Sequence, residues 1–281
     1  MNQTLVAQAF SLWRLFKLFI MKNDFDEEGY LGEQISEFRQ EILLEFDKLF
    51  SCARDFNRLA QKEKINFPFG NNQQHALIAT IFCRVLNSYQ SVLILLSFGL
   101  TSEAEVVLRS LMEATFSLCA CSIDDNFYTE YINSFHAQRL RFAKNVHSKN
   151  FSELLMTNIP HSELKKLKEK CEEMGAREIK VKELAERSKM EYYYYGPYWD
   201  LSLSSHISPK STECYLNIKD NDFYIELLPK HDPKRFKVLI IIAVDMLIRS
   251  LKAFYDFFGY NEPEILSTMF NDWKILLHED E

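Results

Sequence analysis

The side chains best suited to chemistry lie within a segment, 102–121, that is otherwise apolar. When this segment is projected as a helix, apolar residues cover most of its circumference, as in a central helix. A narrow polar stripe remains, made of Arg109, Ser110, Glu113 and Ser117. Arg109 and Glu113 are four residues apart and would share one face. Two interpretations stay open: an ion pair at a surface or interface, or a polar pair that lines a pocket.

A second polar side chain, Arg139, falls near the centre of the apolar face of segment 125–148. An arginine is rarely buried without a partner. We therefore expect Arg139 to meet a carboxylate, and Glu113 on the preceding helix is the natural candidate. The alternative is that the guanidinium of Arg139 reaches the edge of the helix and stays in water.

The third feature is a tyrosine-rich segment, 192–208. If Pro197 begins a helix, Tyr198, Ser202 and His206 share one face at i, i+4 and i+8. They supply hydrogen-bond donors, acceptors and a group that titrates near neutrality. Alternatively, His206 caps the end of the helix and the tyrosines fill a surface groove. The candidate catalytic site consists of Arg109, Glu113, Arg139, Tyr198, Ser202 and His206.

Helices would position these residues. The 281-residue chain has only seven glycines and seven prolines, so breaks in helical structure are few. Periodicity and capping signals predict helices near 3–21, 31–63, 72–98, 102–121, 125–148, 162–173, 180–188, 197–207, 233–258 and 262–277. Their short connections favour antiparallel neighbours. The sequence thus predicts an all-α antiparallel helical bundle.

One segment departs from the helical pattern. Residues 213–228 alternate between apolar and polar types on both sides of a polar turn, which predicts a small β-hairpin insertion. For the domain organisation, we expect an N-terminal helical arm over 1–65 and a main bundle domain over 66–281. Segment 5–20 is rich in Leu, Phe and Trp and carries Arg14 and Lys17. Two interpretations stay open: a helix that lies on a membrane surface, or, as we favour, a packing or homodimerisation helix.

Composition narrows the class of protein. The formal net charge of −7 argues against a surface built for nonspecific nucleic-acid binding. The six cysteines are scattered without a CxxC pair, so we expect reduced thiols in a cytoplasmic protein, with no metal and no cofactor. The longest apolar stretch, 238–248, contains Asp245 and is too short to span a bilayer, so integral membrane insertion is not expected.

Short motifs give a family resemblance. The pattern R-S-L-x-E at Arg109–Glu113, the tyrosine-rich helix after it and Y-x-x-x-S-x-x-x-H at Tyr198–His206 resemble DUF5677, a family of bacterial helical proteins of unknown function. The resemblance covers roughly residues 70–260. It implies an all-α fold in which the Arg, Glu, Ser and His positions converge.

That family is distantly similar to HEPN-type helical proteins, many of which cut RNA or act in phage defence. Their R-x4-6-H mark fits the spacing of Arg141 and His147. The resemblance implies a stress or phage-defence effector that acts as a metal-independent ribonuclease, with His206 as base and Arg109 or Arg139 as the cation. The stretch 132–152, basic and free of acidic residues, is compatible with RNA or an anionic ligand. The alternative is a non-catalytic module that binds a small anionic ligand or a partner protein.

Overall fold

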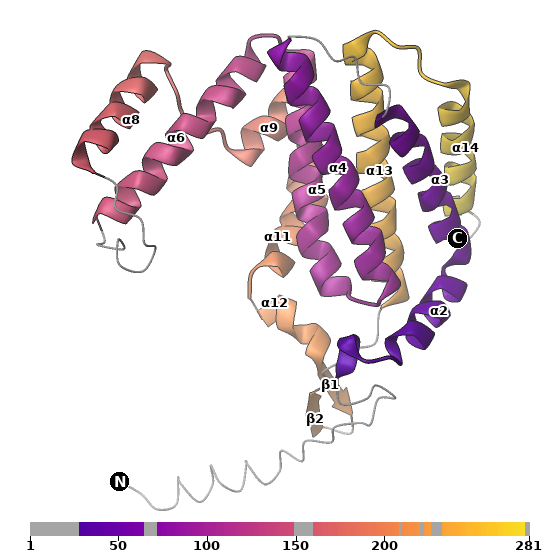
Figure 1. Cartoon of the computed structure of the whole chain (residues 1–281). Helices are drawn as coiled ribbons and strands as arrows, with labels where there is room; N and C mark the ends of the chain where they lie inside the picture. The colour runs from indigo at the N-terminus through magenta and orange to yellow at the C-terminus, as the bar shows by residue number, and fades with distance from the viewer. Residues whose placement is uncertain are drawn as a thin grey trace, which may run out of the picture.

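The computed structural model describes residues 28–64, 72–148, 160–207, 209–219, 222–225 and 232–278. Helices dominate it, which confirms the all-α class (Figure 1). The longer helices are α2 (Ile35–Glu45), α3 (Asp47–Lys64), α4 (Gln73–Ser97), α5 (Thr101–Ile123), α6 (Phe127–Ser148), α8 (His161–Glu173), α13 (Pro233–Phe258) and α14 (Glu264–His278). The shorter ones are η1 (Gly29–Leu31), α9 (Val181–Arg187), α10 (Glu191–Tyr193), the π-helical turn η2 (Tyr194–Tyr198), α11 (Trp199–Ser205), α12 (Pro209–Thr212) and η3 (Glu213–Tyr215).

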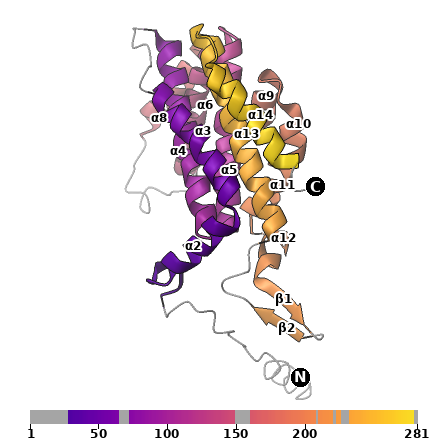
Figure 2. The same cartoon turned by 90° about the vertical axis from the view of Figure 1, so that its right-hand side faces the viewer.

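Three long helices, α4, α5 and α13, run side by side and form the centre of the molecule (Figures 1 and 2). The turn between α4 and α5 depends on Gly99, whose φ is +72°. A Cβ atom there would lie 2.7 Å from the ring of Phe38, so only glycine fits without a shift. At the start of α13, Asp232 accepts a hydrogen bond from the amide of Lys234, and Pro233 occupies the first turn.

The described part of the expected N-terminal arm belongs to this bundle. Helix α3 packs against α4, α13 and α14, and its Phe56 is fully buried beside Trp273. The hydroxyl of Tyr89 on α4 donates to the backbone oxygen of Ala53 at 2.8 Å. Residues 28–64 thus pack on the bundle through an apolar face that is part of the common core. The proposed homodimerisation helix, 5–20, lies outside the described residues.

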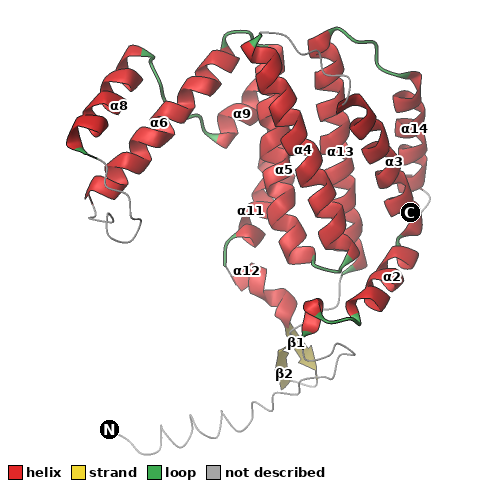
Figure 3. Ribbon diagram, viewed as in Figure 1, coloured by secondary structure: helices red, strands yellow, loops and turns green. Residues whose placement is uncertain are grey.

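A two-stranded antiparallel sheet lies within segment 213–228. Strand β1 (Leu216–Lys219) pairs with β2 (Asp222–Ile225), with Leu216 opposite Ile225 and Lys219 opposite Asp222. In Figure 3 these strands lie beyond one end of the helical bundle. They follow α12 and η3, which link them to the tyrosine-rich segment.

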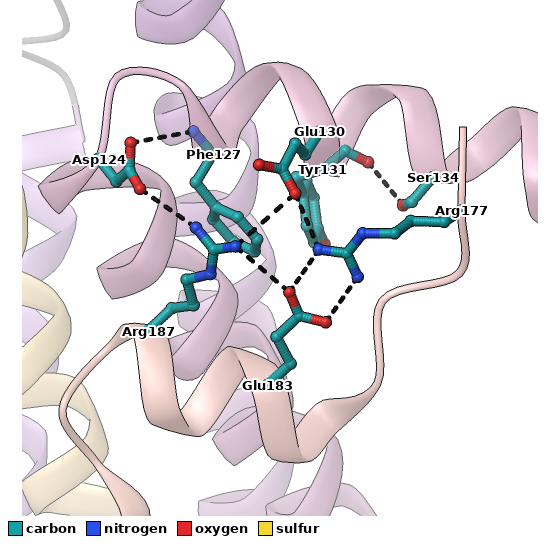
Figure 4. Close-up of polar contacts among 8 residues, drawn as sticks. All are labelled: Asp124, Phe127, Glu130, Tyr131, Ser134, Arg177, Glu183 and Arg187. Carbon is teal, nitrogen blue, oxygen red and sulfur yellow. Dashed lines mark hydrogen bonds and ion pairs between the residues drawn. The ribbon is translucent and has the colours of Figure 1, made fainter. Parts of the chain in front are cut away.

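Helix α6 begins on the bundle and then extends past it, with α8 packed beside its outer part (Figure 1). Its base is held by charged side chains that connect it to α9 (Figure 4). Arg177 lies 2.8 Å from Glu130 and also pairs with Glu183, while Arg187 lies 3.2 Å from Asp124. The backbone amides of residues 126 and 127, then Arg187, lower the pKa of Asp124. These contacts fix the direction in which α6 leaves the bundle.

Two helices, α4 and α5, are long and apolar enough to cross a membrane by length and composition alone. In the apolar windows that meet this criterion, 44% and 56% of the residues are buried inside the protein. Core helices of soluble proteins meet the same criterion, so this property is weak evidence for insertion.

Candidate functional site

Four of the six predicted site residues meet where α5 and α11 pack together. Arg109 donates from Nε to Ser202 Oγ at 3.1 Å and from Nη2 to Tyr198 Oη at 2.6 Å. Its Nη2 also lies 3.1 Å from Glu113 Oε1. The hydroxyl of Tyr198 completes a closed triangle by donating to the same carboxylate oxygen at 2.8 Å. The i, i+4 spacing on α5 therefore creates an anchor for a tyrosine brought in from a distant segment.

Tyr198 is held on every side. The residue is 6% exposed, and its ring stacks on Tyr194 with ring centroids 5.3 Å apart and lies 6.1 Å from the ring of Phe116. The guanidinium carbon of Arg109 lies 4.9 Å from the ring centroid. Burial, then the hydrogen bond to Glu113, raises the pKa of Tyr198 well above its ordinary value. Tyr198 is thus a fixed, protonated donor near neutral pH.

A second polar cluster joins side chains of α5 and α11 to a side chain of a third helix, α13. Arg235 on α13 pairs through Nε with Glu105 on α5 and, at 2.6 Å through Nη1, with Asp200 on α11. Glu105 is only 7% exposed, so its charge depends on this partner. The remaining nitrogen of Arg235, Nη2, is buried and has no hydrogen-bond partner among the described residues.

A third cluster repeats the arrangement of the first on α13. Asp245 and Arg249, again four residues apart, both contact the hydroxyl of Tyr193. The guanidinium carbon of Arg249 lies 4.6 Å from the Tyr193 ring centroid. The tyrosine-rich segment is therefore attached to α13 through Tyr193 and to α5 through Tyr198.

Tyr193→Phe should weaken the loss of stability at alkaline pH. Burial, then the hydrogen bond to Asp245, raises the pKa of Tyr193 to about 12, above the value of about 10 expected in the unfolded chain. Between these values the folded protein keeps a proton that the unfolded chain releases. The contribution of Tyr193 is therefore complete below about pH 10 and is lost as the pH rises toward 12. Urea unfolding of both proteins at about pH 9 to 11 measures this loss; equal slopes against pH would contradict it.

The other two predicted site residues lie elsewhere. Helix α11 ends at Ser205, so His206 leaves the helical face with φ −108° and ψ 145° and is exposed. It forms no hydrogen bond or ion pair with the other five candidates, all of which are described. Arg139 is also exposed, and its guanidinium lies over the ring of Phe135 at 5.8 Å. The expected contact between Arg139 and Glu113 is wrong, because α6 has left the bundle at this point.

The R-x4-6-H spacing falls on the outer end of α6. The guanidinium of Arg141 is exposed and pairs with Glu178 at 2.7 Å. The side chain of His147 lies outside the described residues. The match of this pair to the R-x4-6-H motif stays a prediction.

Several functional candidates were missed by the sequence analysis: Arg84, Glu105, Tyr193, Asp200, Arg235, Asp245 and Arg249. The sequence did contain a signal for two of them: Asp245 is the single charge within an apolar run, and Arg249 follows it four residues later. Arg84 on α4 is exposed and donates to Ser110 Oγ on α5 at 3.4 Å.

The chemistry that these groups favour is recognition of negative charge. In the described part of the chain, no group of three or more His, Cys, Asp and Glu residues is arranged to hold a metal ion. Arg109 uses Nε and Nη2 in its contacts, and its Nη1 has no hydrogen-bond partner among the described residues. Its side chain is 29% exposed. A guanidinium held in this way keeps two N–H donors for an external oxygen.

Comparison with known proteins gives one match. The model of the family of unknown function DUF5677 matches residues 75–224. No curated protein and no solved structure matches the chain. The matched region includes Arg109, Glu113, Tyr198 and Ser202, but not α13. Because the match covers more than half of the sequence, the chain belongs to the DUF5677 family.

Proposed function

We propose that this protein is a non-catalytic helical module that binds an anionic group, such as a phosphate, on the surface of α5 around Arg109. The observation that carries the proposal is the Nη1 nitrogen of Arg109, which has no partner among the described residues while the rest of the guanidinium is held by Ser202, Tyr198 and Glu113. Holding an arginine in its binding geometry reduces the entropy lost when it binds a ligand.

Further polar groups lie on the same turn of α5. Arg84 donates to Ser110 Oγ, and Glu113 is the carboxylate that pairs with Arg109. The hydroxyls of Ser110 and Ser202 already accept hydrogen bonds from these arginines and supply further polar groups.

The ribonuclease hypothesis receives less support from this geometry. Acid–base cleavage of RNA needs a base within hydrogen-bond reach of the reacting hydroxyl. His206, the residue proposed for that role, is exposed beyond the end of α11. Tyr198 keeps its proton at neutral pH because burial and Glu113 raise its pKa. The Arg109 cluster therefore fits binding better than proton transfer.

Thermal unfolding in the presence of inorganic phosphate, pyrophosphate and a short single-stranded RNA tests the proposal. An anion at about 100 times its dissociation constant should stabilise the protein by about 2.7 kcal/mol. Arg109→Gln should abolish this stabilisation. Arg249→Gln is the matched control, because it removes the guanidinium from the equivalent cluster on α13 and should leave the ligand-dependent stabilisation intact.

Three results would overturn the proposal. The first is the absence of stabilisation by all three anions. The second is stabilisation that persists in Arg109→Gln. The third is RNA cleavage by the purified protein that is lost in His206→Ala, which would establish the ribonuclease hypothesis instead.

A further inference from the structure

We infer that the anion bound at Arg109 is the phosphate of a nucleotide, whose base stacks on two exposed aromatic rings, those of Tyr195 and Trp199. This inference rests on the proposed function, because it assigns a chemical class to the ligand of the same site. It depends on one arrangement: the segment that holds the guanidinium of Arg109 also presents these two rings to solvent.

The tyrosine-rich segment exposes both rings on its outer face. Tyr195 is 63% exposed and Trp199 is 62% exposed. They are four residues apart, so they lie on one side of the helix that runs from η2 into α11. A Cβ atom at Gly196 would meet no atom within 4 Å, so the described residues leave open space beside the backbone there. Aromatic side chains this exposed on adjoining turns are typical of an interaction site.

The other tyrosines account for the attachment of this segment to the bundle. Tyr193 contacts Asp245 on α13, and Tyr198 donates to Glu113 on α5. The π-helical turn η2 lies between these two anchors, and such turns are frequent at functional sites. The outward rings are therefore carried by a segment that is fixed at two points.

A series of ring contacts connects the outer face to the anion site. The ring of Tyr195 lies edge-on to that of Tyr194, with centroids 5.2 Å apart. Tyr194 stacks on Tyr198 at 5.3 Å, and the guanidinium carbon of Arg109 lies 4.9 Å from the Tyr198 centroid. Trp199 follows Tyr198 directly in the chain. The exposed rings are thus close neighbours of the guanidinium that is proposed to bind the anion.

Together these groups favour a ligand that carries both a negative charge and a flat ring. Arg109 has Nη1 without a partner among the described residues, and its N–H groups suit a phosphate oxygen. Exposed tyrosine and tryptophan rings stack on nucleic-acid bases of every type, because each base has a π-face. In a nucleotide a ribose joins base to phosphate, so one molecule can use both groups.

The ring of Tyr195 is also held before a ligand arrives. Lys182 on α9 lies with its ammonium 5.8 Å from the centroid of this ring, and the same ammonium lies 3.6 Å from Glu186. The edge contact with Tyr194 limits the ring from a second direction. A side chain that is already ordered loses less entropy when a base stacks on it.

A comparison of AMP with ribose 5-phosphate tests the inference, because the two ligands share sugar and phosphate and differ in the base. Their dissociation constants are measured by ligand-observed NMR titration. AMP should bind at least about fivefold more tightly, as expected for stacking of one base. Trp199→Leu and Tyr195→Ala should each reduce this ratio and leave the affinity for ribose 5-phosphate unchanged, which also shows that the variants fold.

Phe135→Ala is the matched control for the loss of an exposed aromatic ring. Phe135 is similarly exposed, at 58%, but lies on α6, so its replacement should leave the ratio of the two dissociation constants unchanged. A 5′-phosphorylated trinucleotide RNA identifies the source of the nucleotide. Tighter binding than AMP would indicate an RNA end, and equal binding would indicate a free nucleotide; the base contributes in both cases.

The outcomes separate this inference from the proposed function. Equal affinities for AMP and ribose 5-phosphate, with both lost in Arg109→Gln, would overturn the nucleotide inference and keep the anion site. A ratio that persists in both Trp199→Leu and Tyr195→Ala would overturn it as well. If neither ligand binds, or if both bind Arg109→Gln as well as the wild-type protein, the proposed function itself is wrong.

Discussion

Replacing Phe82 with alanine is expected to lower the free energy of unfolding by about 4 kcal/mol. Phe82 on α4 is fully buried, and its ring stacks on that of Phe254 on α13 with centroids 5.0 Å apart. Removing the ring leaves a cavity between two of the three central helices, which cannot close without moving one of them. The cost therefore combines lost burial with lost contacts on both sides of the cavity.

Urea unfolding followed by circular dichroism measures this effect, and the midpoint should fall without a change in slope. Thermal unfolding should show a decrease of about 10 °C. Ile94→Ala, at an exposed site on the same helix, should change the stability by less than about 0.5 kcal/mol. A loss below about 1 kcal/mol for Phe82→Ala would mean that α4 and α13 do not share the packing described above.

Replacing Glu105 with alanine is expected to lower the free energy of unfolding by about 3 kcal/mol. Glu105 is 7% exposed and pairs with Arg235 on α13, whose Nη2 is already buried without a partner among the described residues. Without Glu105, the guanidinium, whose side chain is 26% exposed, keeps its charge and has Asp200 as its one remaining counterion among the described residues. The cost comes from the charge left behind rather than from the value of the pair itself.

Two further variants separate the cost of the unpaired Arg235 charge from the value of the ion pair itself. Glu105→Gln keeps a hydrogen-bond acceptor and should lose less stability than Glu105→Ala. Arg235→Met with Glu105→Leu removes both charges and should recover part of the loss, since a buried pair can often be replaced by apolar groups. Chemical denaturation of the three proteins provides the measurement. If the double variant is less stable than Glu105→Ala, the buried charge is not the source of the cost.

The sequence predicted the part of the site that depends on local periodicity. The polar stripe of α5 and the i, i+4 relation of Arg109 and Glu113 follow from helical geometry alone. Tyr198 and Ser202 could be placed on one face for the same reason. The family resemblance implied that the Arg, Glu, Ser and His positions converge: Arg109 contacts Glu113 and Ser202, whereas His206 lies apart from them.

The misplaced residues mark the limits of local reasoning. His206 was assigned to the helical face, but α11 stops at Ser205, four residues before Pro209. A nearby proline disfavours a continued helix, so this signal was available. The predicted contact of Arg139 with Glu113 was wrong for a different reason. The sequence does not show where the bundle ends, so an exposed apolar face on α6 has the same pattern as a buried one. The pairing of Arg235 with Glu105 depends on tertiary structure, since 130 residues separate them.

The π-helical turn at Tyr194–Tyr198 constrains how many residues can separate Tyr193 from Tyr198. In an ordinary α-helix, residues five apart diverge by about 140°, so Tyr193 and Tyr198 could not both face the central helices. The i→i+5 pattern of a π-helix brings such residues toward one direction. Losing one residue between them would let the segment form an ordinary α-helix, in which residues four apart also share a face, whereas gaining one residue would turn the two tyrosines apart. During divergence of such a sequence, this segment should therefore tolerate the loss of one residue better than the gain of one.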